Sequence, residues 1–240
     1  MCDQCGCAGS GTKVVEVNQS LLAANQEIAE KNRKHIEALG AVAINMISSP
    51  GSGKTTLLEK TIEVLGDELR IGVIEGDIET ERDAQRIRSK GVPVVQLTTG
   101  GACHLDGALT HKGLHELQNQ LDGNKLDLLF IENVGNLVCP ATFYLGEHQR
   151  LVMISVPEGE DKPAKYPRAF IGSQVFVINK TDVLPYFDFS VEYATEDALR
   201  LNPELSVMAL SATTGEGFEK WVAWLRSLKI SILQSYVTSP

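Results

Sequence analysis

The sequence predicts an α/β fold in which a doubly wound, mostly parallel β-sheet is flanked by helices. From residue 41 onward, short apolar runs alternate with amphipathic stretches of helical period. This alternation is typical of parallel strands that are joined by crossover helices. The chain has 240 residues, of which 43% are hydrophobic, so it can bury one substantial core.

The first forty residues are predicted to form two parts ahead of the sheet. Residues 1–17 hold a cysteine cluster and several small residues without apolar periodicity, which predicts a flexible tail. Residues 18–40 carry a loose helical stripe of leucine and isoleucine that ends at a glycine. We therefore expect a helix over residues 18–40 and one α/β domain over residues 41–235.

Within that domain, strands and helices are expected in regular alternation. The expected strands are residues 42–47, 70–74, 93–97, 126–131, 150–156, 174–178 and 206–210. The expected helices are residues 54–65, 79–90, 106–120, 192–201 and 217–230. The chain contains no internal repeat or low-complexity block, so a single domain accounts for the region.

Charge and hydropathy exclude two classes of partner. The chain has 22 lysines and arginines against 31 acidic residues, a net charge of −9, and no basic run, which argues against nucleic-acid binding. Its apolar runs are too short to span a bilayer. The first residues lack the basic and apolar segments of a signal peptide, so we expect a cytoplasmic protein without a membrane partner.

A phosphate-binding loop is predicted between the first strand and the first helix of the domain. Residues 48–56 read SSPGSGKTT and follow the pattern GxxxxGK(S/T), with Ser48 in place of the first glycine. Glycines in this loop let backbone N–H groups turn toward phosphates, the lysine neutralises phosphate charge, and the threonine hydroxyl binds Mg²⁺. The predicted P-loop residues are Gly51, Ser52, Gly53, Lys54, Thr55 and Thr56.

Guanine specificity is predicted by Asn179, Lys180 and Asp182, which follow a late strand as NKTD. A carboxylate at Asp182 accepts hydrogen bonds from the N1–H and amino groups of guanine, a pair that adenine does not offer. The stem of Lys180 packs over the ring, and Asn179 ties the loop together. Ser211 and Ala212, after the last strand, support the base from the other side. We expect the nucleotide to be GTP or GDP.

Two acidic residues at strand ends are candidates for the phosphate side of the site. Asp77, in EGDIET, is expected to bind Mg²⁺ directly or through water, or to orient the attacking water. Glu132, in FIENVG, lies where a Walker-B acid is expected; the alternative for both is a cap or a solvated acid. With Lys54 they are the predicted catalytic residues. No glutamine matches the residue that positions water, so we expect slow intrinsic GTP hydrolysis.

The five cysteines are odd in number, which argues against a disulfide framework. Cys103-His104 and Cys139 lie in loops after strands, and we expect them at the same sheet edge as the nucleotide. Two thiolates and an imidazole suit Zn²⁺ or Ni²⁺, and a metal shared between two subunits would complete the ligand set. The alternative is a pair of buried structural cysteines.

The other three cysteines, Cys2, Cys5 and Cys7, form a compact cluster in the tail. With the terminal amine they offer a square-planar ligand set suited to Ni²⁺; a redox role is the alternative. His111 and His115 lie one helical turn apart. They are interpreted as exposed helix residues, because no third ligand is placed for them.

Together these motifs resemble the HypB family, the nickel-insertion GTPases of nickel–iron hydrogenase maturation, which are SIMIBI-class P-loop G proteins. The resemblance covers nearly the whole chain. It rests on CxxCGC from Cys2, SSPGSGKT from Ser48, GDIET around Asp77, GGACHLD around Cys103, ENVGNLVCP around Cys139 and NKTD from Asn179.

The resemblance implies a homodimer that handles nickel through two metal sites. A tight nickel site uses the three early cysteines, and a weaker zinc or nickel site at the subunit interface uses the residues that match Cys103, His104 and Cys139. The implied partners are the small zinc-bearing nickel chaperone HypA and the hydrogenase large subunit. Some members carry a histidine-rich storage stretch; this chain has five histidines, which argues against bulk nickel storage.

The expected function is therefore that of a GTP-hydrolysing nickel metallochaperone. In this hypothesis GTP and Mg²⁺ order the loops bearing Asp77, Cys103 and Cys139 and favour a dimer, and hydrolysis then permits metal transfer. Two alternatives stay open. One is a sibling G protein for another nickel or cobalt enzyme, such as urease, and the other is a non-enzymatic nickel or zinc buffer.

Overall fold

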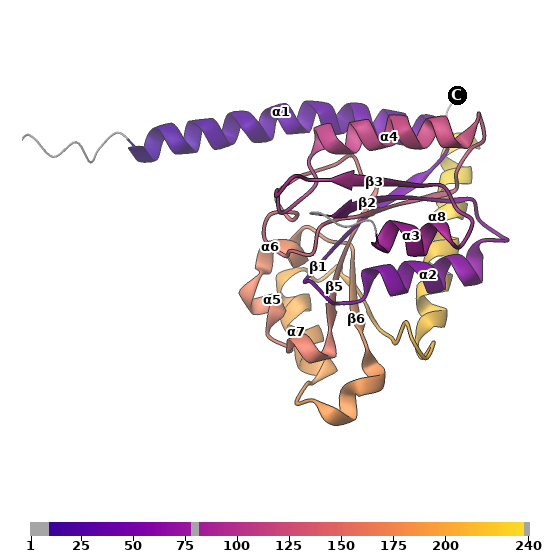
Figure 1. The fold of residues 1–240 in the computed structure, drawn as a ribbon. Coiled ribbons are helices and arrows are strands. Elements are labelled where there is room, and N and C mark those ends of the chain that lie inside the picture. Colours follow the sequence, from indigo (N-terminus) through magenta and orange to yellow (C-terminus); the bar gives the residue numbers. More distant parts are fainter. Residues whose placement is uncertain (1–9, 78–81, 238–240) are drawn as a thin grey trace, which may run out of the picture.

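The computed structural model describes residues 10–77 and 82–237, in which seven parallel strands form one sheet flanked by helices (Figure 1). The strands are β1 (Val42–Ser48), β2 (Ile71–Asp77), β3 (Val94–Thr98), β4 (Leu128–Glu132), β5 (Gln149–Ser155), β6 (Val175–Asn179) and β7 (Ser206–Ala209). Their order is β3-β2-β4-β1-β5-β6-β7. The predicted doubly wound sheet is confirmed, and every described pair of neighbouring strands is parallel.

Helices follow most of the strands. The α-helices are α1 (Ser10–Ala38), α2 (Lys54–Leu65), α3 (Arg82–Arg88), α4 (Gly107–Leu121), α5 (Lys162–Lys165), α6 (Pro167–Ile171), α7 (Val191–Leu201) and α8 (Phe218–Val237). Two short 3-10 helices are η1 (Val156–Glu158) and η2 (Thr181–Tyr186).

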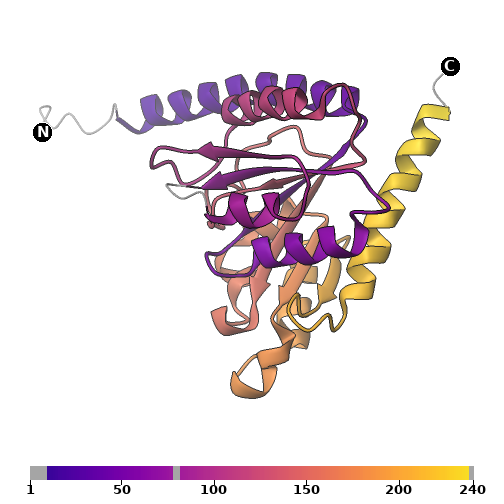
Figure 2. The same cartoon turned by 45° about the vertical axis from the view of Figure 1, so that its right-hand side comes forward.

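The core lies on both faces of the sheet, because successive side chains of a strand point to opposite faces. Ile44 and Met46 of β1 pack on the face covered by α2 and α8, where Trp221 is fully buried. Figure 2 shows α8 (yellow) beside α2 (purple). Ala43 packs on the other face, in the cluster that includes Leu114 of α4. Each face of the sheet thus has its own helical layer.

The N-terminal helix is longer than predicted. It begins at Ser10, whereas the sequence predicted a helix only from residue 18. The segment contains no proline, and nothing in it prevents the helical backbone from continuing. α1 lies along α4 (Figure 1), and its end is fixed in the core by Ile36. The cysteines at positions 2, 5 and 7 lie outside the described residues.

The connection between β4 and β5 positions the site. Residues 133–148 join these two strands without any helix. β1 lies between β4 and β5 in the sheet, and this segment passes the carboxyl end of β1 on its way from β4 to β5. It does so in contact with β1, since Asn136 forms an isolated antiparallel bridge with Ser48.

Candidate nucleotide and metal site

The P-loop lies between β1 and α2 and is shaped by glycines in left-handed conformations. Gly51 has a φ of 76° and Gly53 a φ of 94°. A Cβ atom at Gly53 would lie 2.6 Å from Nδ2 of Asn179, so this glycine also permits the base loop to approach. That approach is used, because Asn179 Nδ2 donates to the carbonyl of Ser52 at 2.8 Å.

Ser48, which replaces the first motif glycine, is fully buried, and its side chain forms hydrogen bonds within the loop. Its Oγ accepts hydrogen bonds from Lys54 Nζ and from Ser52 Oγ, both at 2.7 Å, and donates to the carbonyl of Ser49 at 2.9 Å. The serine hydroxyl therefore fits this turn and sets the direction of the Lys54 side chain.

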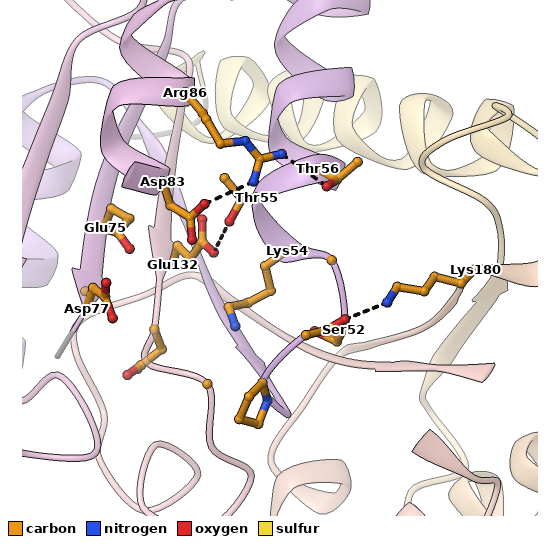
Figure 3. A pocket seen from close by; sticks show the side chains of 16 residues that line it. Ser52, Lys54, Thr55, Thr56, Glu75, Asp77, Asp83, Arg86, Glu132 and Lys180 are labelled. Atoms are coloured by element: carbon orange, nitrogen blue, oxygen red, sulfur yellow. Dashed lines mark hydrogen bonds and ion pairs between the residues drawn. The ribbon is translucent and has the colours of Figure 1, made fainter. Parts of the chain in front are cut away.

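A cavity of about 400 Å³ opens above the P-loop and is lined by acidic residues from β2, α3 and β4 (Figure 3). Glu132, at the end of β4, is buried and accepts a hydrogen bond from Thr55 Oγ1 at 2.9 Å. Burial raises the pKa of Glu132, and Lys54 and Thr55 oppose that shift. Asp77 is the last residue of β2 and lines the same cavity, so both predicted acids face the P-loop.

Sequence reasoning missed three polar residues of this cavity: Glu75, Asp83 and Arg86. Burial and the neighbouring carboxylates of Glu132, Asp77 and Asp83 raise the pKa of Glu75 to about 8. An acid inside the apolar strand IGVIEGD was the available signal. The signal for Arg86 was weak, since this residue reads as an ordinary helix cation; it donates to Asp83 and to Thr56 Oγ1.

The NKTD segment packs against the P-loop and the loop after β7. Lys180 has a φ of 63°, and its Nζ donates to the carbonyl of Gly51 at 2.7 Å. Asn179 Oδ1 accepts from the backbone N–H of Ala212 at 3.1 Å. Asp182 Oδ1 accepts from Ser211 Oγ at 2.6 Å. All the predicted base-site residues thus meet at one place beside the P-loop.

The structure also brings Cys103, His104 and Cys139 together. Their ligand atoms all lie within 4.8 Å of one another, with Cys103 Sγ 3.8 Å from His104 Nδ1. A hydrogen bond to Cys103, together with partial burial, raises the pKa of the Cys139 thiol. The His104 ring stacks on Phe143 with ring centroids 4.1 Å apart, and partial burial lowers its pKa. Two sulfurs and one imidazole nitrogen at these separations fit a thiophilic divalent ion.

The β4–β5 connection joins this thiol cluster to the P-loop. Asn136 pairs with Ser48 through its backbone, and its Nδ2 donates to the carbonyl of Cys103 at 3.5 Å. The preceding Gly135 lies against Pro50 of the P-loop, where a Cβ atom would lie 3.0 Å from Pro50 Cα. One short segment therefore contacts the phosphate loop and the cysteine loop at the same time.

His111 and His115 were expected to be exposed helix residues; both lie on α4, where His115 is exposed and His111 is half-buried. The reason given for that expectation is wrong, because a third ligand, His35 of α1, joins them in a cluster with ligand atoms within 4.8 Å. The sequence could not show this, because His35 and His111 meet only through the packing of α1 on α4.

Across residues 10–77 and 82–237, no helix combines the length and hydropathy needed to cross a membrane.

The sequence matches one family model and several hydrogenase maturation factors. A family model described as CobW/HypB/UreG, nucleotide-binding domain, matches residues 42–209. The hydrogenase maturation factor HypB of Azotobacter chroococcum mcd 1 is 50% identical over 216 residues, which cover 90% of this chain and 70% of that protein. The hydrogenase/urease maturation factor HypB of Helicobacter hepaticus is 40% identical over 224 residues, covering 93% and 92%.

The fold agrees with these sequence matches. The crystal structure of HypB from Helicobacter pylori in complex with nickel superposes with a TM-score of 0.83 at 38% identity. The superposition covers 87% of this chain and 96% of that one.

Proposed function

Because the chain belongs to the HypB family of hydrogenase maturation factors and is a P-loop GTPase, we propose that its nucleotide state controls the binding and release of nickel. Nickel is the cargo in this proposal. The observation that carries it is the segment from Gly135 to Cys139, which contacts both the P-loop and the thiol cluster.

On the nucleotide side, the proposed roles follow from the contacts. Backbone N–H groups of the P-loop and the ammonium of Lys54 bind the phosphates. The carboxylate of Asp182, held by Ser211, accepts from the N1–H and amino groups of guanine. Water attacks the γ-phosphorus and the bond from that phosphorus to the β–γ bridging oxygen breaks, giving GDP and phosphate.

The acidic side of the cavity fits Mg²⁺. Glu132 Oε2 is buried and, among the described residues, has no hydrogen-bond partner, while Oε1 already faces the Thr55 hydroxyl. Thr55, Glu132 and Asp77 would hold the ion through oxygen atoms, the ligands that Mg²⁺ prefers. The ion would neutralise charge on the β- and γ-phosphate oxygens. Asp77 is the proposed residue that orients the attacking water, and the chain's lack of a matched glutamine supports slow turnover.

On the metal side, one subunit offers two thiols and one imidazole at Cys103, Cys139 and His104. A complete coordination shell needs further ligands, and a second copy of the chain supplies them in the proposed homodimer. GTP is proposed to order the β4–β5 segment so that both copies present these ligands. Hydrolysis relaxes the segment and releases the ion.

Delivery to a client needs further components, which we propose from the family. The three tail cysteines hold a separate nickel ion, the small chaperone HypA exchanges nickel with this protein, and the hydrogenase large subunit is the client in the cytoplasm. Zinc is the proposed competitor at the thiol cluster, because thiolate and imidazole ligands suit both ions.

The experiment that tests this proposal is sedimentation velocity of the purified chain, with the same samples assayed for GTP and ATP hydrolysis. With nickel and a non-hydrolysable GTP analogue we expect a dimer, and with GDP a larger monomer fraction. Cys139→Ser should abolish the nickel-dependent part of the dimerisation while GTP hydrolysis is retained. A chain that stays monomeric under every condition, or that hydrolyses ATP as well as GTP, would rule the proposal out.

Urease is a second candidate client. The Helicobacter hepaticus relative, which is 40% identical to this chain, is named as a maturation factor for both hydrogenase and urease. Deleting the gene and measuring both activities, with and without added nickel, separates the two clients.

A further inference from the structure

Three of the five histidines form a cluster away from the thiols. His35 comes from α1, and His111 and His115 come from the middle of α4. Nε2 of His111 and Nε2 of His115 lie 3.2 Å apart, and the centroids of the His35 and His115 rings lie 4.8 Å apart. The cluster therefore spans two helices that are distant in the sequence.

The surrounding contacts prepare His111 to be a ligand. Asn32 is fully buried, and its Nδ2 donates to the carbonyls of Gly107 and Leu145 at 2.8 and 3.1 Å. This fixes the amide so that Oδ1, 2.8 Å from His111 Nδ1, is an acceptor. Nδ1 of a neutral His111 must then carry the proton, which leaves a lone pair on Nε2, directed toward His115. A histidine whose other nitrogen is held in this way is typical of metal sites.

The other two rings complete the arrangement. Gln118 Oε1 lies 2.8 Å from Nε2 of His35 and orients that ring. His115 is exposed and can turn its Nε2 toward an ion. Metal–nitrogen bonds of about 2.0–2.1 Å in a tetrahedral site separate ligand nitrogens by about 3.4 Å. The 3.2 Å separation of the His111 and His115 nitrogens is close to this value. The ligand atoms of all three residues lie within 4.8 Å of one another, so the widest pair must close by at most about 1.4 Å.

We propose that His35, His111 and His115 form a binding site for a divalent transition-metal ion that prefers imidazole, with Zn²⁺ and Ni²⁺ as the ions it takes. Three neutral imidazoles are sufficient for such an ion, and solvent completes the shell because His115 is exposed. The bound ion joins α1 to α4 by a bridge additional to their packing. This inference is independent of the proposed function of the thiol cluster.

The consequence is a metal-dependent docking of the N-terminal helix. α4 begins at Gly107, three residues after His104, so an ion at the histidine cluster stabilises the helix that follows the thiol loop. Occupancy of the cluster is therefore expected to reduce opening of α1 away from α4. A cluster that only packs the two helices together would show no such dependence on metal.

The test uses the full chain with all five cysteines replaced by serine, which removes both thiol sites. Titration with ZnCl₂ and, separately, NiCl₂ should show one bound ion per chain. His115→Gln should weaken binding about tenfold or more, since loss of even a supporting contact has that effect at such sites. Lys112→Ala, an exposed change on the same helix, is the matched control and should bind like the parent. Absence of binding, or equal affinity in His115→Gln, would overturn the proposal.

A second measurement on the unsubstituted chain guards against a folding defect in the serine variant. Imidazole resonances of His35, His111 and His115 should shift together when Zn²⁺ is added, while His148 serves as the internal reference. Amide hydrogen exchange over residues 20–38 should slow at the same time. Resonances that stay in place through saturating Zn²⁺ would overturn the proposal just as directly.

Discussion

At the scale of single residues, Ser48 shows how a P-loop can hold its shape with serine in place of the first motif glycine. Its hydroxyl accepts hydrogen bonds from both Lys54 and Ser52. A glycine at this position has no side chain that could accept them, so the serine adds support to the loop. Ser48→Gly should therefore lower GTP affinity by about tenfold, because the bond from the Lys54 ammonium is charge-assisted and such a bond contributes about 1.5 kcal/mol or more. Fluorescent-nucleotide titration measures this, with Lys54→Ala as the control, because loss of the ammonium that binds the phosphates should lower GTP affinity further. A loss after Ser48→Gly as large as that control's would show that the serine is essential.

Asp182 carries the prediction of base specificity. Asp182→Asn replaces an acceptor of two guanine hydrogen bonds by a group that also donates, so GTP affinity should fall roughly a hundredfold, about 3 kcal/mol. Xanthosine triphosphate, whose oxygen at C2 accepts a hydrogen bond, should gain affinity in the same variant. Competition titration with both nucleotides measures this change in preference. An unchanged preference for GTP would mean that Asp182 does not contact the base.

His148 gives a prediction about pH. Burial and the nearby Arg33 lower its pKa to about 4, although Glu37 opposes the shift, and its Nδ1 accepts from the N–H of Ala43 at 3.1 Å. The unfolded chain binds this proton near pH 6.5 and the folded chain only near pH 4, so the contribution to stability is present above pH 6.5 and is lost as pH falls toward 4.

The corresponding variant is His148→Asn, which keeps an acceptor but does not titrate. Between pH 7 and pH 5 the parent should lose about 2 kcal/mol more of its free energy of unfolding than the variant does. Urea unfolding at both pH values measures the difference. Parallel pH profiles would mean that His148 is protonated equally in the folded and unfolded chains.

At the scale of elements, the attachment of α1 to α4 depends on buried asparagines as well as on apolar packing. Asn25 accepts from the N–H of Gly107 at 2.7 Å and donates to the carbonyl of Tyr144 at 2.8 Å. Asn25→Ala leaves both groups without this partner and should lower the free energy of unfolding by about 2 kcal/mol. Gln26→Ala, on the exposed side of the same helix, should have little effect. Equal denaturation midpoints for the two variants would contradict this account of α1.

Element by element, the apolar pattern predicted the sheet well and the boundaries of other parts less well. All seven strands follow from short apolar runs, of which β1 is buried along its whole length, and the helix at residues 54–65 follows from its apolar stripe. The start of α1 was placed too late because residues 10–17 lack an apolar stripe, although their backbone is helical. The short helices α5, α6 and η2 contain or adjoin proline and were too short to show periodicity.

The candidate site could be predicted where motifs carry it and not where packing creates it. Gly-Lys-Thr, NKTD and Cys103-His104 are recognisable in the sequence, and the structure brings each group together as expected. Glu75 was overlooked because a single acid in an apolar strand has no motif. His35 was overlooked because its neighbours lie on another helix, which only the three-dimensional packing of α1 and α4 reveals.

At the scale of the whole molecule, strand order explains why nucleotide and metal sites adjoin. The sheet places β1 between β4 and β5, so their connection crosses the P-loop on its way to Cys139. Asn136→Ala removes the side-chain contact to Cys103 while the cysteines and P-loop keep their ligand atoms. We expect it to reduce the effect of nucleotide on nickel affinity to about twofold or less, below the usual range for coupled sites. Asn119→Ala, exposed on α4, is the control and should retain the parent's response in the same titration.

The central claim is that nucleotide and nickel are coupled, and one measurement tests it most directly. In a chain with the three tail cysteines changed to serine, nickel dissociation constants are measured by competition with a chelator, once with a non-hydrolysable GTP analogue and once with GDP. We predict at least about fivefold tighter nickel binding with the GTP analogue, the lower end of ordinary coupling between sites. Equal dissociation constants in the two nucleotide states would contradict the account.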